Sequence, residues 1–238
     1  MQWTSLVKIL ILSMFLFSNV VDASTKEPDL RKVAKEKREI KGFNSMHISG
    51  AGKIYIKQGT KESIIIETEN CYLNNIKSEV SNNILYLGAK DPILNSKVLN
   101  YYVTVKNLQE IQSTGEASIF SRNTISDENF YLATDGAGDV DLKIKVKQFK
   151  ANIIGNSHVK ILGNAAHQII KITGAGVFDA KKLQNKTAIV TINGAGNAKI
   201  NATSELDVKI SGFGIVSYYG QPKITQEISG HGEIIPIE

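Results

Sequence analysis

The sequence has very few residues that could cross-link or stiffen the chain. It contains one cysteine, Cys71, one tryptophan and four prolines in 238 residues. A single cysteine excludes an intramolecular disulfide, so the fold must be held by its hydrophobic core and its backbone hydrogen bonds. Because a lone cysteine is more often a small apolar core residue than a reactive thiol, we expect Cys71 to be buried.

The excess of positive over negative charge is also small. The formal net charge is +5, and residues 24–41 hold seven basic and four acidic side chains, which leaves only about +2 for the chain from Gly42 onward. Such a small excess excludes the basic footprint of a nucleic-acid-binding protein, so no nucleic acid is expected as a partner. We interpret residues 24–41 as a solvated, charged linker or a short helix.

Long hydrophobic runs are absent except at the amino end. Lys8 precedes the apolar residues 9–17, and Val21-Asp22-Ala23 follows as a small-residue cleavage site. These are the three parts of a secretory signal peptide, and the run is shorter than the roughly 20 residues that span a bilayer. We therefore expect residues 1–23 to be removed and the mature protein to be exported, to the periplasm, the cell surface or the medium. An uncleaved amino-terminal anchor is the alternative.

Glycine, by contrast, is abundant and recurs at regular intervals. Turns of the type Gly-x-Gly, or Gly-x followed by another small residue, begin at Gly50, Gly115, Gly136, Gly155, Gly174, Gly194, Gly212 and Gly230. From Gly115 onward these first glycines are 18 to 21 residues apart. A fixed period near 20 residues is typical of solenoid proteins, in which each repeat stacks on the next.

The residues around these turns alternate between apolar or small and polar. The position two residues before the first glycine is usually isoleucine, as in Ile153 and Ile172, and the position four residues after it is apolar, as in Val159 and Val216. Two residues after it the side chain is always small, which predicts an inward-facing corner. The corner glycines at that position are Gly138, Gly176, Gly196, Gly214 and Gly232.

This period-2 alternation, repeated about every 20 residues, predicts an all-β fold. We expect a right-handed parallel β-helix-like solenoid whose rungs occupy residues 107–238, about six or seven in number and stacked roughly 4.8 Å apart. Residues 42–106 are strand-rich but less regular, and they are expected to form an amino-terminal β cap and the first rung. Residues 42–238 would then be a single solenoid domain.

No catalytic, metal or cofactor site is expected. Gly136-Ala137-Gly138 precedes strand-like residues, whereas a phosphate-binding glycine loop leads into a helix. The acidic residues Asp135, Asp139 and Asp141 occur in one repeat only, unlike the nine-residue repeats of calcium-binding β-rolls. Rungs this short also leave no room for the long loops that build an enzyme cleft.

One outward-facing set of residues departs from the polar pattern. Val177, Phe213 and Ile215 occupy positions that are polar in other repeats. An exposed apolar patch often marks a partner surface, although a neighbouring loop or a second copy of the chain could equally bury it. The small polar residues before the first glycines, such as Ser211 and Ser229, could bind a glycan or could instead satisfy the backbone of the turns.

The opening segment Gly42-Phe43-Asn44-Ser45-Met46-His47-Ile48-Ser49-Gly50-Ala51-Gly52, with the later turns up to Ser229-Gly230-His231-Gly232, resembles the bacterial "putative auto-transporter adhesin, head GIN domain" family. The resemblance covers residues from Gly42 to the carboxyl end. It implies export, a β-helix-like fold and an envelope or adhesive role, and it brings no catalytic residues with it.

The function expected from these features is a non-enzymatic, exported interaction module of the cell envelope or surface. Its partner would be a protein or a glycan at the envelope, and a homo-oligomer is possible. The alternative is a carbohydrate-binding or carbohydrate-active β-helix protein.

The signal-peptide interpretation predicts that cleavage after Ala23 removes Trp3, the single tryptophan, while all eight tyrosines stay in the mature protein. Exported protein should therefore show tyrosine but no tryptophan fluorescence, and its intact mass should equal that of a chain whose first residue is Ser24. Tryptophan emission from purified exported protein would contradict cleavage.

Overall fold

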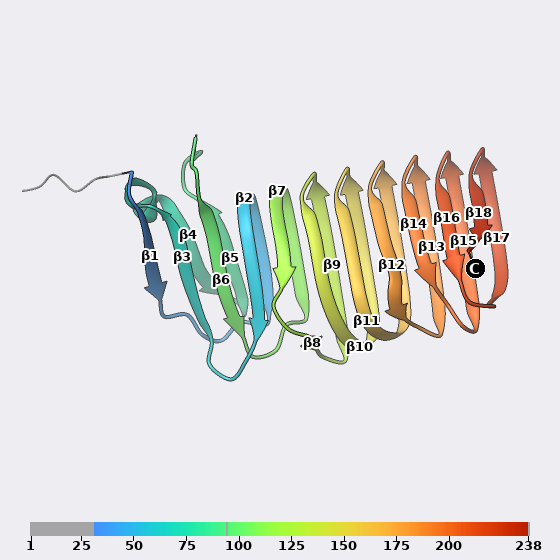
Figure 1. Ribbon diagram of the computed structural model, residues 1–238, viewed down its shortest axis with the longest axis horizontal. Helices are drawn as coiled ribbons and strands as arrows, with labels where there is room; N and C mark the ends of the chain where they lie inside the picture. Colours follow the sequence, from blue (N-terminus) through green and yellow to red (C-terminus); the bar gives the residue numbers. More distant parts are fainter. Residues whose placement is uncertain (1–30, 94, 238) are drawn as a thin grey trace, which may run out of the picture.

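The computed structural model describes residues 31–93 and 95–237, so the signal peptide expected at residues 1–23 lies outside the described residues. It confirms the all-β expectation: the chain forms a β-solenoid of about 7 turns with a spacing of ~19 residues. The rungs stack into an elongated body, and the less regular cap lies at the amino-terminal end (Figure 1). The core therefore runs as a continuous column along the length of the stack.

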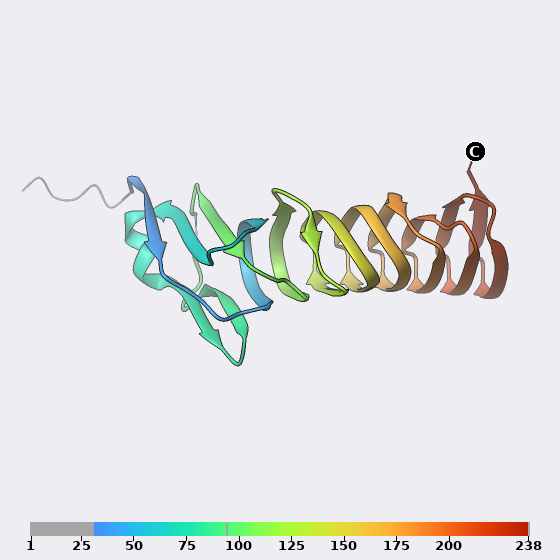
Figure 2. The ribbon, with the colours of Figure 1, turned by 90° about the horizontal axis from the view of Figure 1, so that it is seen from below.

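Each rung after the cap consists of two strands that meet at a glycine corner, so the solenoid has two sheet faces with the core between them (Figure 2). The first face contains β9 (Asn129–Gly136), residues 148–155 of β10 (Asp139–Gly155), residues 167–174 of β11 (His158–Gly174), β13 (Thr187–Gly194), β15 (Glu205–Gly212) and β17 (Lys223–Gly230). The second face contains the first halves of β10 and β11, then β12 (Val177–Gln184), β14 (Asn197–Asn201), β16 (Ile215–Tyr219) and β18 (Glu233–Pro236). All of these pairings are parallel.

In-register stacking places equivalent side chains above one another in the core. Ile153, Ile172 and Ile192 form one such column, and none of the three is exposed to solvent. A row of buried phenylalanines continues this stacking, in which Phe149 lies between Phe130 and Phe178 at ring-centroid distances of 6.0 and 6.3 Å. Because burial alternates along strands such as β10, most polar residues between the core positions face solvent.

The glycine corners leave no space for larger side chains. At Gly194 the φ angle is +127°, and a Cβ atom would lie 2.5 Å from the carbonyl oxygen of Gly174 in the preceding rung. Gly196, two residues later, is buried, and a Cβ there would lie 2.6 Å from Cγ2 of Ile172. Added Cβ atoms at the equivalent positions Gly176 and Gly214 would meet an isoleucine Cγ2 at 2.7 and 2.6 Å. A Cβ added at Gly138 would meet the backbone of Ala117, and one added at Gly232 would meet the side chain of Ile210.

The first complete rung joins the solenoid to its cap. It is β2 (Ser45–Gln58), which pairs in parallel along almost its whole length with β7 (Glu110–Ser121) of the next rung. On the cap side β2 pairs with two separate strands, β5 (Ile84–Ala89) for the first face and β6 (Leu99–Val105) for the second. The short β8 (Ile125–Ser126) lies between β7 and β9 in the chain and pairs with β10.

The cap itself ends the stack with antiparallel strands. β3 (Ser63–Glu69) pairs with β6, and β4 (Ile76–Ser81) pairs with β5. The 3₁₀ helix η1 (Asn70–Asn75) connects β3 to β4. β1 (Val33–Arg38) then adds an antiparallel strand to the outer side of β3. Changing from parallel to antiparallel pairing ends the repeat on this side.

Two sequence-based expectations for this region differ from the structure. Residues 33–38 were expected to be linker or short helix, but they form β1, whose charged side chains suit a sheet edge that must not pair further. The guanidinium of Arg38 fastens this strand by donating hydrogen bonds to the carbonyls of Leu73 and Ile76, both at 2.8 Å. The expectation of a buried Cys71 was wrong: Cys71 is exposed, because η1 contributes no buried residue to the core.

A buried carboxylate fixes the loop between β5 and β6 to the cap. Glu69 is only 4% exposed, and it accepts hydrogen bonds from the Lys97 N–H at 2.7 Å and from the Ser96 hydroxyl at 2.8 Å. Burial on its own raises the pKa of Glu69, but these hydrogen bonds, with one from the Thr68 hydroxyl, outweigh it and hold the pKa at about 2. Glu69 therefore stays ionised and keeps the loop in place.

The corner geometry predicts a sharp contrast between two valine substitutions that are three residues apart. Gly196→Val should overpack the corner against Ile172 and cost roughly 1–3 kcal/mol or more of unfolding free energy. Lys199→Val, on the exposed side of β14, should change it by no more than about 0.5 kcal/mol. Urea unfolding of both variants measures the contrast, and equal effects would contradict the inward position of Gly196.

The low pKa of Glu69 predicts an acid-dependent contribution to stability. A carboxylate whose folded-state pKa is depressed from 4.5 to about 2 stabilises the fold above pH 4.5, and this contribution is lost as the pH falls toward 2. The difference in unfolding free energy between wild type and Glu69→Gln should therefore shrink over that range. The exposed Glu233→Gln serves as the control, and a difference that stays constant with pH would contradict the assignment.

Candidate functional site

Of the exposed apolar residues near the carboxyl end, Phe213 and Ile215 lie together at a glycine corner, whereas Ile228 and Ile235 lie elsewhere on the last rung. Phe213 is 67% exposed, and its ring stacks on that of His231 in the next rung, with a centroid distance of 5.4 Å and an angle of 5°. Ile215, two residues further along, is 36% exposed. Val177 lies on the same outward row but is only half-exposed, and Asn197 separates it from Ile215 in the register. We call Phe213, His231 and Ile215 the corner patch.

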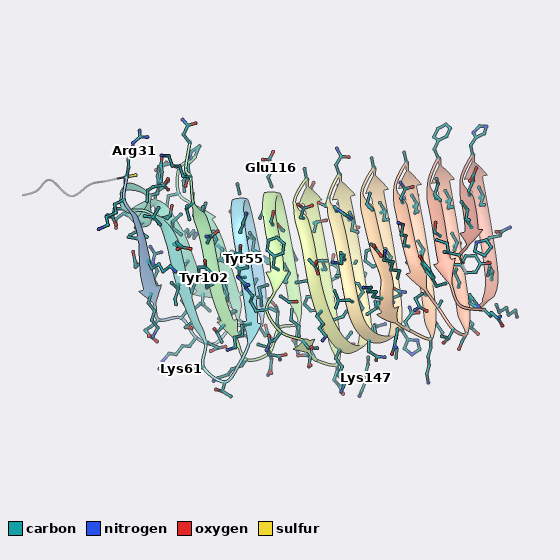
Figure 3. The ribbon with its side chains drawn as sticks, in the orientation of Figure 1. Arg31, Tyr55, Lys61, Tyr102, Glu116 and Lys147 are labelled. Carbon is teal, nitrogen blue, oxygen red and sulfur yellow. The ribbon has the colours of Figure 1, made fainter. Side chains whose placement is uncertain are left out.

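A second surface feature is a row of aromatic rings near the junction with the cap. Adjacent strands β6, β2 and β7 place Tyr102, Tyr55 and Phe120 side by side, with centroid distances of 5.2 and 5.5 Å (Figure 3 labels both tyrosines). The guanidinium of Arg122 lies 4.1 Å from the centre of the Tyr55 ring, within the range of a cation–π contact. Sequence reasoning missed this row, although Tyr55 and Phe120 both lie five residues after a first glycine.

The end of this row is tied to the cap by a charged hydrogen bond. The Tyr102 hydroxyl donates to the Glu67 carboxylate at 2.7 Å, and the Asn100 amide donates to the same oxygen at 2.9 Å. The hydrogen bond from Asn100 is the largest cause of the lowered pKa of Glu67, and the bond from Tyr102 adds to it. The bond to Glu67 is in turn the main cause of the raised pKa of Tyr102. The row is therefore well anchored, which suits a stabilising role at the junction.

A cavity of about 790 Å³ opens at the corner of the first rung. It is lined by residues 49–53 of β2, by described residues of the loop and strand between Ala89 and Tyr101, and by Glu116 and Ser118 of the next rung. It exists because the pairing of β2 with β5 ends at Ile48 and its pairing with β6 begins at Lys53. The two cap strands thus separate at this corner, and residues 90–93 and 95–98 line the gap; the connection between β5 and β6 rises above the strands in Figure 1.

The polar groups of this cavity carry both signs of charge. Lys53, Lys90 and Lys97 line it together with Asp91 and Glu116, all of them exposed; Figure 3 shows Glu116 at the glycine-corner edge. The Lys90 ammonium donates to the carbonyl of Asn74 at 3.2 Å. One feature of the sequence indicates this site, because the connection between β5 and β6 is much longer than the corners of the repeat.

The acidic residues singled out in the sequence do not assemble into a metal site. Asp141 forms an ion pair with Lys160 at 2.8 Å on the outer face. Across residues 31–93 and 95–237, no group of three or more His, Cys, Asp and Glu side chains is placed to hold a metal ion. In the same part of the chain, no helix has the length and hydrophobicity to cross a bilayer.

Comparisons with solved structures support the solenoid fold. A crystal structure described as a putative adhesin from Bacteroides fragilis NCTC 9343 is 25% identical, with a TM-score of 0.83 over 87% of this chain and 98% of that one. Two structures from Parabacteroides distasonis ATCC 8503, described as a putative lipid binding protein and a putative adhesin, have TM-scores of 0.73 and 0.71. They are 17% and 18% identical, and each alignment covers 87% of this chain and 97% of the other.

The search of curated protein sequences gave no match. The family model "Putative auto-transporter adhesin, head GIN domain", however, matches residues 42–222, which contain the first corner and all but the last of the later ones. The match begins at the segment on which the resemblance was based and extends through the repeated rungs. The chain therefore belongs to the auto-transporter adhesin, head GIN domain family.

Proposed function

We propose that this protein is an exported, non-enzymatic, adhesin-like module of the cell envelope or surface that binds a partner through its corner patch. The observation that carries the proposal is the exposure of Phe213, at 67%, on a rigid stack whose other corners carry small or polar residues at that position. Family membership and the adhesin-like neighbours support the same class of function.

The geometry of the patch suits a binding surface. Phe213 and His231 are held by backbone hydrogen bonds at successive corners, of 2.9 Å from Phe213 N–H to Gly194 and 2.8 Å from His231 N–H to Gly212. These bonds hold the backbone of both corners, and the stacking of the two rings restricts their side-chain rotamers, which lowers the conformational entropy lost on binding. Aromatic anchors of this kind commonly supply most of the binding energy of an interface.

A second candidate function is carbohydrate binding, and the cavity at the first corner favours it. The cavity is within the usual size range for small-ligand sites, and hydroxyl, amide and charged groups line it. This function is compatible with an adhesin-like role, because many surface interactions are made to glycans. It uses a different part of the molecule from the corner patch.

The corner-patch proposal predicts the effect of removing one ring. Beads coated with residues 24–238 should bind at least one surface in a panel of bacterial cells, envelope fractions and extracellular-matrix proteins. Phe213→Ser should weaken that binding at least about tenfold, as expected for an aromatic anchor.

Ile189→Ser is the matched control, because Ile189 is 42% exposed but lies on β13, away from the corner patch. Equal retention of the wild-type and Phe213→Ser beads would contradict the proposal. So would sedimentation showing a dimer that Phe213→Ser dissociates, since a second copy would then occupy the patch.

A further inference from the structure

The corner of the first rung lacks a hydrogen bond that the later corners make. In six successive corners, the N–H after the first glycine donates to the first-glycine carbonyl of the preceding rung at 2.8–3.1 Å. The donors are Ala137, Asn156, Ala175, Ala195, Phe213 and His231. The equivalent donor in the first rung is the N–H of Ala51, and no described strand pairs with residues 49–52 on the cap side.

The space beside this donor is open. A Cβ built on Gly50 would meet no atom within 4 Å, whereas one built on Gly174, Gly194 or Gly212 would lie 2.5–2.9 Å from a carbonyl oxygen of the preceding rung. Gly50 and Ala51 both line the 790 Å³ cavity. The cavity therefore occupies the place where a preceding corner, with its carbonyl acceptor, would otherwise lie.

The charges around this donor favour an anionic acceptor. Lys53 and Lys97 are exposed, line the same cavity and enter none of the ion pairs found among the described residues. The backbone at Lys97 is held in position by the bond from its N–H to buried Glu69. With Lys90, three lysines face two acidic side chains, Asp91 and Glu116. A backbone N–H beside lysines is a common arrangement for binding a carboxylate or a phosphate.

We propose that this cavity binds an acidic sugar residue, a hexose that carries a carboxylate. The sugar carboxylate takes the place of the missing glycine carbonyl and accepts from the Ala51 N–H, and Lys53 and Lys97 balance its charge. The inference rests on the carbohydrate-binding candidate within the proposed function and names its site and ligand class.

The acidic side chains distinguish a sugar from a simple anion. Asp91 and Glu116 repel the negative charge of any anionic ligand, but they can also accept hydrogen bonds from the several hydroxyls of a sugar ring, which a small anion such as acetate does not offer. Ser118 and Asn95 on the same lining add hydroxyl and amide groups that can both donate and accept. A cavity of this volume has room for one or two sugar units.

Calorimetric titration of residues 24–238 with a matched pair of sugars tests the inference. Methyl glucuronide and methyl glucoside differ only in a carboxylate replaced by a hydroxymethyl group. The glucuronide should bind saturably, and the glucoside at least about tenfold more weakly. The double variant Lys53→Gln/Lys97→Gln should weaken glucuronide binding by at least about tenfold. The control double variant, Lys171→Gln/Lys199→Gln, removes two exposed lysines from distant rungs and should leave binding unchanged.

Several results would overturn the inference. These are the absence of saturable glucuronide binding up to 10 mM (roughly the weakest affinity of interest), equal binding of the two sugars, and equal binding by the Lys53→Gln/Lys97→Gln variant. Binding of acetate, inorganic phosphate or laurate as tight as that of the glucuronide would also overturn it, because the sugar hydroxyls would then contribute nothing. If any of these results is found while Phe213→Ser still weakens bead binding, the cavity inference fails and the corner-patch proposal stands. If glucuronide binds as expected but Phe213→Ser has no effect on bead binding, the corner-patch proposal fails and the cavity inference stands.

Discussion

The contact on which the rest of the structure depends is the backbone hydrogen bond between successive glycine corners. An N–H one residue after the first glycine reaches the glycine carbonyl of the rung before it, at 2.8–3.1 Å. This approach is possible only because the first glycine adopts a positive φ and has no Cβ to collide with that carbonyl. Once the corners are fixed at this separation, the strands on both faces are in register, and the isoleucine, valine and phenylalanine side chains stack in continuous columns.

A stack built in this way exposes an unpaired strand edge wherever it stops. At the amino-terminal side the chain solves this by changing to antiparallel pairing, with β3 on β6, β4 on β5 and the charged β1 as the outermost strand. The cap strands pair with β2 on both faces, but they leave the corner between the faces unpaired. The cap strands separate at residues 49–52, and the cavity of the first corner lies in that gap.

The surface features relevant to binding arise from this same geometry. Every outward position is repeated along the solenoid, so an apolar or aromatic side chain at a position that is small or polar in other rungs changes the surface at that rung alone. Phe213 follows Ala137, Asn156, Ala175 and Ala195 at the corner, and the aromatic row of Tyr102, Tyr55 and Phe120 gives way to Asp141 and Lys160 in the next rungs. A rigid scaffold with locally changed side chains is well suited to recognition, because it holds these side chains in place at little entropic cost.

The sequence by itself determined the repeat and everything that follows from it. The glycine spacing and the alternation of apolar residues were enough to predict an all-β solenoid, its rung length and the crowded corner positions such as Gly196, because identical rungs impose the same local constraint many times. The tertiary structure alone decided how the stack ends. β1, the exposed position of Cys71, the buried Glu69 and the cavity beside Ala51 all depend on non-repeated contacts between segments far apart in the chain, such as β3 with the loop before β6. A periodic pattern carries no information about such contacts, since each of them occurs only once.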